Sequence, residues 1–136
     1  MSSKRYEIGL LDTSVVIDLH LLRPEHLPRE SWIAAVTMAE LVAGPIAAHT
    51  DKERWARQHR ATRAMLDFHV VPFDDECALE YGRIYARVAE IGRKPHGARL
   101  ADLLIAAVAA RHSAPLYTRN PADFEGLEDI VTVVGV

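Results

Sequence analysis

The sequence predicts an α/β fold in which a short parallel sheet of four or five strands is flanked by helices. Short apolar runs alternate along the chain with longer stretches of helical pattern. The apolar runs are continuous, as expected for strands that are buried on both faces of a parallel sheet. The length of 136 residues suits a single domain spanning residues 1–136.

Five segments have the composition of strands, and the third of them is rich in β-branched and aromatic residues. In chain order the predicted strands are Glu7–Leu11, Trp32–Val36, Phe68–Phe73, Pro115–Thr118 and Ile130–Val136.

Helical patterns fill the intervals between these strands. The last predicted helix is dense in alanine and leucine and apolar nearly all round, so we expect it to be buried. A break is predicted at Gly92–Gly97, where a glycine follows a helix and proline and a second glycine come next. The predicted helices are Ser14–Leu22, Met38–His49, Asp51–Asp67, Asp74–Ile91 and Arg99–Arg111.

Composition excludes several classes of protein. A single cysteine, Cys77, rules out an internal disulfide, and we expect a small core residue in a cytoplasmic protein. The N-terminus has a basic start and an apolar stretch, but Asp12 and Asp18 interrupt that stretch and argue against a secretory signal. No apolar run reaches membrane-spanning length, so no membrane association is expected. The seven histidines show no metal-ligand spacing.

One segment, Lys52–Arg63, is locally basic although the formal net charge of the chain is −3. The net charge argues against broad, non-specific binding to polyanions. It does not exclude nucleic acid, because the location of charge matters more than its total. The simpler interpretation of this segment is a solvated helix face, and contact with nucleic acid stays open beside it.

Acidic side chains follow the predicted strands at the points where the strands end. Asp12 directly follows the first strand, Glu40 comes shortly after the second, and Asp102 is expected in the first turn of the alanine-rich helix. Because ligands of open parallel sheets bind beyond the carboxyl ends of the strands, we expect the three carboxylates to converge. Magnesium and manganese prefer such oxygen ligands. A metal site of this kind can activate water for attack on a phosphodiester.

Each acid also has a purely structural interpretation. Asp12 could cap the following helix. Thr37 and Glu40 fit a capping box, and Asp102 could complement a helix dipole. The residues by themselves therefore leave an enzyme and a binding module both open.

Four segments, in order and spanning nearly the whole chain, resemble the PIN domain family. They are LLDTSVVIDL near the N-terminus, TMAELVAG in the middle, DLLIAAVAARH later and LYTRNPADF near the end. More closely, they resemble the VapC toxins of bacterial toxin–antitoxin pairs. The resemblance implies the PIN-like three-layer fold, with helices on both sides of the short parallel sheet.

The resemblance also implies an activity and partners. Relatives of this kind are endoribonucleases that depend on Mg²⁺ or Mn²⁺ and leave a 5′ phosphate and a 3′ hydroxyl. They pair with a VapB-type antitoxin and often form homodimers. Carried over residue by residue, Asp12, Glu40 and Asp102 match the catalytic, metal-binding acids of the family.

Further residues match polar positions that often line the site in the family. Thr13, Ser14 and Thr118 could position a metal-bound water or a phosphate, although a hydroxyl in a turn is as often a cap. Arg99 and Arg119 could contact RNA phosphates, or they could simply be solvated.

One departure from the family pattern is visible in the turn after the fourth strand. Many relatives carry a fourth acid where this chain has Asn120, which could instead cap a short helix beginning at Pro121. Asp123 lies one helical turn further on and could substitute for the missing acid. A second metal site is therefore an open expectation.

Two other functions compete with an RNA-cleaving toxin. One is a non-catalytic PIN-like module that holds RNA or a protein without cutting. The other is a receiver-like phosphoacceptor domain, a fold that also clusters acids at strand ends. The second is disfavoured because no acidic pair ends the first strand, and Asp74 leads from the third strand directly into a helix.

Overall fold

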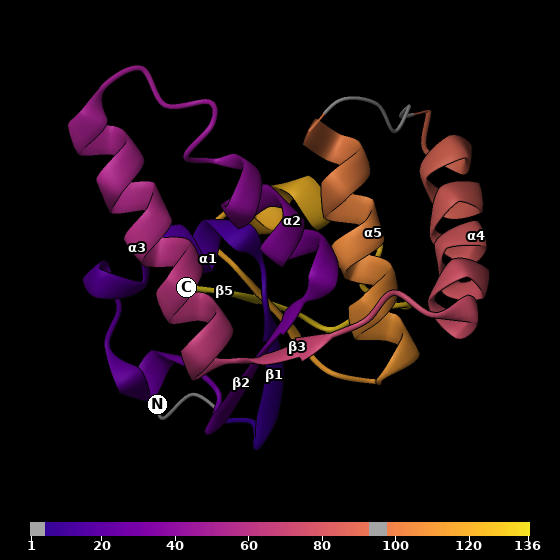
Figure 1. The fold of residues 1–136 in the computed structure, drawn as a ribbon. Coiled ribbons are helices and arrows are strands. Elements are labelled where there is room, and N and C mark those ends of the chain that lie inside the picture. The colour runs from indigo at the N-terminus through magenta and orange to yellow at the C-terminus, as the bar shows by residue number, and fades with distance from the viewer. Residues whose placement is uncertain (1–4, 93–97) are drawn as a thin grey trace.

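A five-stranded, all-parallel sheet forms the centre of the molecule (Figure 1), as the sequence predicts. The structure, a computed structural model, describes residues 5–92 and 98–136. The strand order is β3-β2-β1-β4-β5. The strands are β1 Ile8–Leu11, β2 Glu30–Ala34, β3 His69–Val71, β4 Leu116–Thr118 and β5 Val133–Gly135.

Helices cover both faces of this sheet, which gives the three layers expected. In Figure 1, α4 and α5 lie together on one side and α3 lies on the other. Within the described ranges, no helix is both long and apolar enough to cross a bilayer. The α-helices are α1 Thr13–Ile17, α2 Ala35–Ala43, α3 Asp51–Asp67, α4 Asp75–Glu90 and α5 Ala98–Arg111, and the 3-10 turns are η1 Leu19–Leu21, η2 Pro24–His26 and η3 Pro121–Phe124.

Neighbouring residues of each strand contribute to different hydrophobic cores. Leu10 packs in the core beneath α4 and α5, whereas Leu11 packs in the core formed with α1, α2 and α3. In β2, Ala34 packs in the core beneath α4 and α5, and Ile33 packs in the core formed with α1, α2 and α3. Successive side chains of a strand point to opposite faces of the sheet. Because a hydrophobic core covers each face, both side chains of every successive pair must be apolar, and this explains the continuous apolar runs.

The helix that was predicted to be buried is indeed the most buried one. Residues 105–109 of α5 are at most 1 % exposed. The helix lies between the sheet and α4, so its alanines allow close packing on both sides. Cys77 of α4 is fully buried in the same core, as expected for a structural cysteine.

Several predicted boundaries were wrong in ways that affect the site. β2 ends at Ala34 instead of Val36, and α2 begins immediately at Ala35. The helix expected over Ser14–Leu22 ends at Ile17 and continues as a 3-10 turn. The helix expected over Met38–His49 ends at Ala43, before Gly44 and a proline that cannot continue it. The predicted break at Gly92–Gly97 lies outside the described residues except for Gly92, which has a positive φ of 78°.

The strand order creates a switch point between β1 and β4. The chain moves outward from β1 through β2 to β3, and then returns to the other side of β1 to form β4. Connections therefore leave the carboxyl ends of β1 and β4 in opposite directions, and a crevice opens between them. The residues that directly follow β1 and end β4 are Asp12 and Thr118.

We predict that Gly9 in β1 tolerates no side chain. A Cβ at Gly9 would lie 2.5 Å from Cε1 of the buried Tyr117 and 2.9 Å from Cγ of Pro28. Gly9→Ala should therefore lower the free energy of unfolding by about 1–3 kcal/mol. Gly82→Ala is the matched control, because a Cβ at that helical position has nothing within 4 Å. It should stabilise by about 0.5–1 kcal/mol. Urea denaturation measures both, and a Gly9→Ala protein as stable as wild type would contradict this account of the β1–β4 packing.

Candidate functional site

Asp12 lies at the carboxyl end of β1 with only 4 % of its surface exposed. Its backbone N–H donates to the Tyr117 carbonyl at 2.8 Å, which extends the pairing of β1 with β4. Asp12 occupies the N-cap position of α1, but its side chain makes no capping bond. The capping interpretation is therefore wrong for the carboxylate, which points instead to the crevice residues.

Two hydroxyl groups hold the Asp12 carboxylate in place. The Thr118 hydroxyl donates to Asp12 Oδ2 at 2.8 Å, and the Ser14 hydroxyl donates to the same oxygen at 3.0 Å. Each hydroxyl in turn accepts a backbone N–H, from Asn120 at 3.0 Å and from Arg119 at 3.2 Å. Because these N–H groups occupy the acceptor sides of the hydroxyls, both hydroxyl protons are directed at Asp12. Among the described residues, Oδ1 of Asp12 receives no hydrogen bond and is available to another ligand.

Glu40 reaches the same region from α2, where its side chain is exposed. Thr13 Oγ1 lies 2.6 Å from Glu40 Oε1 and 3.0 Å from Thr37 Oγ1. Thr13 has one proton, so it donates to the carboxylate and accepts from Thr37. The expected capping box is wrong, since α2 begins at Ala35 and Thr37 lies inside the helix. Thr37 is fully buried and contacts the site through Thr13, whereas the sequence pattern had assigned it only a capping role. Its spacing of three residues from Glu40 was the signal that both lie on one face of the helix.

Asp102 provides the electrostatic signature of the site. Burial, followed by the negative charges of Asp12, Asp123 and Glu40, raises the pKa of Asp102 from 3.8 to about 7, with Arg99 acting in the opposite direction. Four carboxylates from distant parts of the chain are thus close enough to influence one proton. Asp102 is the fifth residue of α5 and lies beyond its first turn, contrary to prediction. Interaction with the dipole of α5 therefore does not explain the position of Asp102 well.

The turn after β4 places two further residues at the edge of this cluster. Asn120 holds the N-cap position of η3, but its side chain makes no capping bond and is exposed. Asp123 contributes negative charge at Asp102, and its backbone carbonyl accepts a hydrogen bond from Arg99 Nη1 at 2.9 Å. Asp123 is therefore electrostatically part of the cluster, while Asn120 is linked to it through its backbone bond to Thr118.

The two arginines that were considered for RNA binding differ in their surroundings. Arg99 lies beside the acids, where its charge favours ionisation of Asp102. Arg119 instead donates to Asp18 Oδ2 at 3.2 Å and to the carbonyl of Val136 at 3.0 Å. Its guanidinium group thereby ties α1 to the C-terminal strand.

The donor set suits a hard divalent cation, but the side chains do not yet form a closed cage. Over the described part of the chain, no three histidine, cysteine, aspartate or glutamate side chains stand close enough together to hold one ion. Carboxylates that lack a cation between them repel each other and spread apart. An all-oxygen set of several carboxylates matches magnesium or manganese better than zinc. Binding of an ion would therefore require Asp12, Glu40 and Asp102 to close around it.

Known proteins resemble this chain in sequence. The chain matches the PIN domain family over residues 9–128. Ribonuclease VapC5 of Mycobacterium tuberculosis is 35% identical over 128 residues, which cover 92% of this chain and 91% of that protein. Ribonuclease VapC1 of Methanocaldococcus jannaschii is 31% identical over 88% of this chain and 81% of its own length.

A solved structure agrees with these relatives. The crystal structure of VapBC-5 from Mycobacterium tuberculosis, a member of the VapBC family of toxin–antitoxin systems, contains a chain that superposes with a TM-score of 0.84 at 35% identity. The match covers 96% of this chain and 99% of that one. Sequence and fold agree, and the chain belongs to the PIN domain family and to its VapC branch.

Proposed function

We propose that this protein is a divalent-metal-dependent endoribonuclease and the toxin of a VapBC-type toxin–antitoxin pair. The observation that carries the proposal is that burial, followed by the negative charges of Asp12, Asp123 and Glu40, raises the pKa of Asp102 to about 7. A divalent cation would offset the repulsion between these carboxylates and could activate a water molecule there. The names of the relatives, ribonuclease VapC5 and ribonuclease VapC1, support the same activity.

In this proposal Asp12, Glu40 and Asp102 would hold Mg²⁺ or Mn²⁺, and the cation would supply activation of a water molecule and compensation of charge on the phosphate. Thr118 and Ser14 fix the rotamer of Asp12, so one oxygen stays directed to the crevice. Thr13 does the same for Glu40. Attack of water on phosphorus breaks the bond to the 3′ oxygen, which leaves a 5′ phosphate and a 3′ hydroxyl.

The alternative is a non-catalytic PIN-like module that binds RNA or a protein. The absence of a closed three-ligand cage in the described residues is the observation that favours it. An assay of RNA cleavage with added manganese separates the two functions, because a module binds without cutting.

We also propose a VapB-type antitoxin and a second copy of the chain as partners. An arginine of the antitoxin would match the carboxylate geometry of the crevice and replace the cation. Large apolar side chains remain on the surface and suit a homodimer, among them Trp55, Leu66 and Leu79, which are 78%, 72% and 74% exposed. Light scattering of the isolated chain distinguishes a dimer from a monomer.

The first prediction tests the assignment of the three acids. Asp12→Asn, Glu40→Gln and Asp102→Asn each keep the side-chain shape and remove a metal-binding charge, so each should abolish nearly all RNA cleavage in a folded protein. Asp75→Asn, at an exposed position of α4, is the matched control and should retain wild-type activity. Cleavage of labelled RNA with manganese, together with circular dichroism, provides the measurement. Full activity in any of the three variants would remove that residue from the site.

The second prediction follows from the raised pKa of Asp102. The carboxyl ionises near 3.8 in the unfolded chain and near 7 in the folded one, so between these values the folded state binds more protons. Stability of the metal-free protein therefore falls as pH rises through this window. Asp102→Asn removes this penalty, and its Tm should exceed that of wild type by about 2–8 °C at about pH 8. Because Asp102 is partly exposed, solvent screens its charge, and the gain in Tm should lie at the lower end of this range.

Thermal melts in chelator across the pH range test this expectation. The gain in Tm should shrink as the pH falls from 7 toward 4, and it should vanish below about pH 3, where the carboxyl is protonated in both states. Asp75→Asn serves again as the control, and its Tm difference from wild type should not follow this window. A gain for Asp102→Asn that is the same at all pH values would mean that charge repulsion is not its source.

The third prediction concerns a second metal at the turn after β4. Asn120 makes no capping bond and Asp123 acts on Asp102, so we expect one ion to bind firmly and a second weakly beside them. Asn120→Asp should tighten the weak site and lower the magnesium concentration needed for cleavage. Asp123→Asn should weaken the weak site without unfolding the protein. Calorimetric titrations that are identical for wild type and both variants would leave a site of three carboxylates only.

A further inference from the structure

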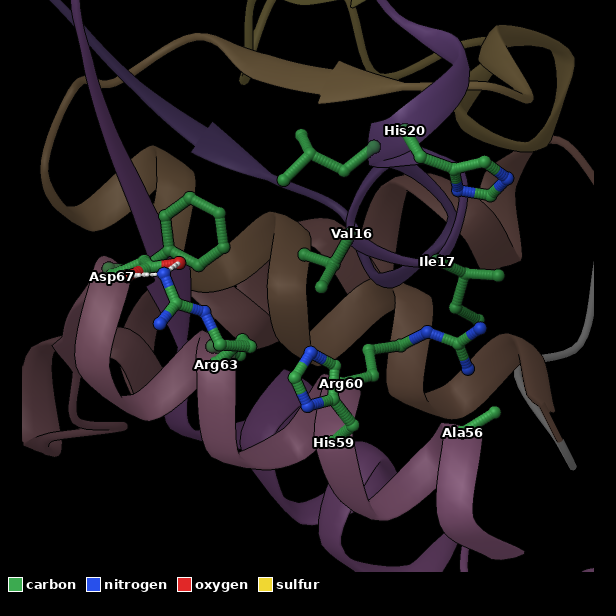
Figure 2. Close-up of a pocket in the computed structure, with 11 residues that line it drawn as sticks. Val16, Ile17, His20, Ala56, His59, Arg60, Arg63 and Asp67 are labelled. Carbon is green, nitrogen blue, oxygen red and sulfur yellow. Dashed lines mark hydrogen bonds and ion pairs between the residues drawn. The ribbon is translucent and has the colours of Figure 1, made fainter. Parts of the chain in front are cut away.

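Two hollows adjoin each other along α3, and one of them reaches the acid site. The first, of about 500 Å³, lies between α3 and the α1–η1 segment (Figure 2). The second, of about 550 Å³, is lined by Thr13 and Glu40 as well as by α3. Both hollows are lined by Ile17, Ala56 and Arg60. Together they form a continuous depression, here named the α3 groove, that leads from the acidic crevice along the helix.

Arg60 differs from the other arginines of α3. Arg54 pairs with Asp51 at 3.2 Å, and Arg63 pairs with Asp67 at 3.0 Å. The remaining arginine of this helix, at position 57, donates to a backbone carbonyl at the end of α2 at 2.9 Å. Within the described residues, Arg60 has neither an ion pair nor a hydrogen bond to the protein.

Figure 2 shows the same contrast. The guanidinium group of Arg63 is joined to Asp67, whereas the side chain of Arg60 extends across the hollow toward Ile17. Arg60 is partly buried and lies where the two hollows meet, so its uncompensated charge faces the groove.

The walls of the groove suit a strand of nucleic acid. Its lining includes Ile17, which is 40% exposed, and the partly buried Phe68, apolar groups against which bases can pack. A free guanidinium group at the rim can bind a phosphate oxygen in a bidentate manner. A purely apolar peptide would fill the floor but leave the charge of Arg60 uncompensated. The unpaired charge of Arg60 and the continuity of the groove with the acid site therefore favour RNA over an apolar protein segment, although Glu53 and Asp67 also line the groove.

We propose that Arg60 binds a backbone phosphate of the RNA strand that flanks the cleaved bond, and that the α3 groove is the path of this strand. This inference rests on the proposed ribonuclease function and adds a substrate-binding residue to it. The arginines of the locally basic segment Lys52–Arg63 then have different roles. Arg54 and Arg63 stabilise the helix surface, and Arg60 contacts substrate.

The test measures the affinity of the protein for a fluorescent single-stranded RNA. A chelator is present, so that metal-dependent cleavage does not affect the measurement. Arg60→Gln should weaken binding about tenfold, the effect of losing one charge-assisted hydrogen bond. The slope of log affinity against log salt concentration should fall by about 0.7, the value for one phosphate contact on a single strand. Arg60→Lys should keep most of that slope, because the charge remains.

Arg54→Gln is the matched control, since it removes the same charge from the same helix outside both hollows. It should leave the affinity and the salt slope near those of wild type. An Arg60→Gln protein that binds RNA like Arg54→Gln would overturn the proposal and leave the groove to a protein segment. An Arg60→Lys protein that loses as much slope as Arg60→Gln would also overturn it. Because the assay contains no metal, its result stands whether or not the chain cleaves RNA.

Discussion

The hydrogen bond from Thr118 Oγ1 to Asp12 Oδ2, 2.8 Å long and buried, joins the two strands between which the sheet reverses its order. It places a carboxylate between β1 and β4, where the connections of the described sheet diverge and a crevice can open. The rest of the site is arranged around this fixed point. Backbone N–H groups of the following turn orient the hydroxyls, and the hydroxyls orient the acid. The position of the Asp12 carboxylate therefore depends on backbone geometry that the fold itself supplies.

The acid cluster has an energetic consequence for the whole molecule. Asp102 holds a proton up to about pH 7 because it is buried and because other carboxylates surround it. Such a cluster opposes folding at neutral pH and is compensated by two hydrophobic cores, one on each face of the sheet. A divalent cation held in this cluster would offset the repulsion between the carboxylates, so in the proposed function cation binding would also stabilise the fold. In the same way, the uncompensated charge of Arg60 is a feature that a phosphate would relieve.

Much of this arrangement was predictable from sequence because it depends on local patterns. Continuous apolar runs identified the five strands, and the alanine-rich composition identified α5 as buried. The positions of Asp12 and Glu40 after strands indicated a shared edge. Other features were not predictable, because they depend on tertiary contacts. The start of α2 at Ala35 removed the capping box, and the role of Thr37 follows from its contact with Thr13 across the crevice. The strand order, and hence the meeting of β1 with β4, has no signature in any single segment.

In the proposed function, the acid cluster binds a divalent cation that RNA cleavage requires. The most direct test follows metal binding and RNA cleavage in parallel on the wild-type protein while manganese is titrated from zero. We predict no cleavage in chelator, and an activation midpoint that coincides with the dissociation constant obtained from the binding isotherm. Because ionisation of Asp102 must precede binding, both midpoints should move to higher metal concentration together when the pH is lowered below about 7. Cleavage that persists in chelator, or that saturates at a metal concentration unrelated to binding, would contradict the account.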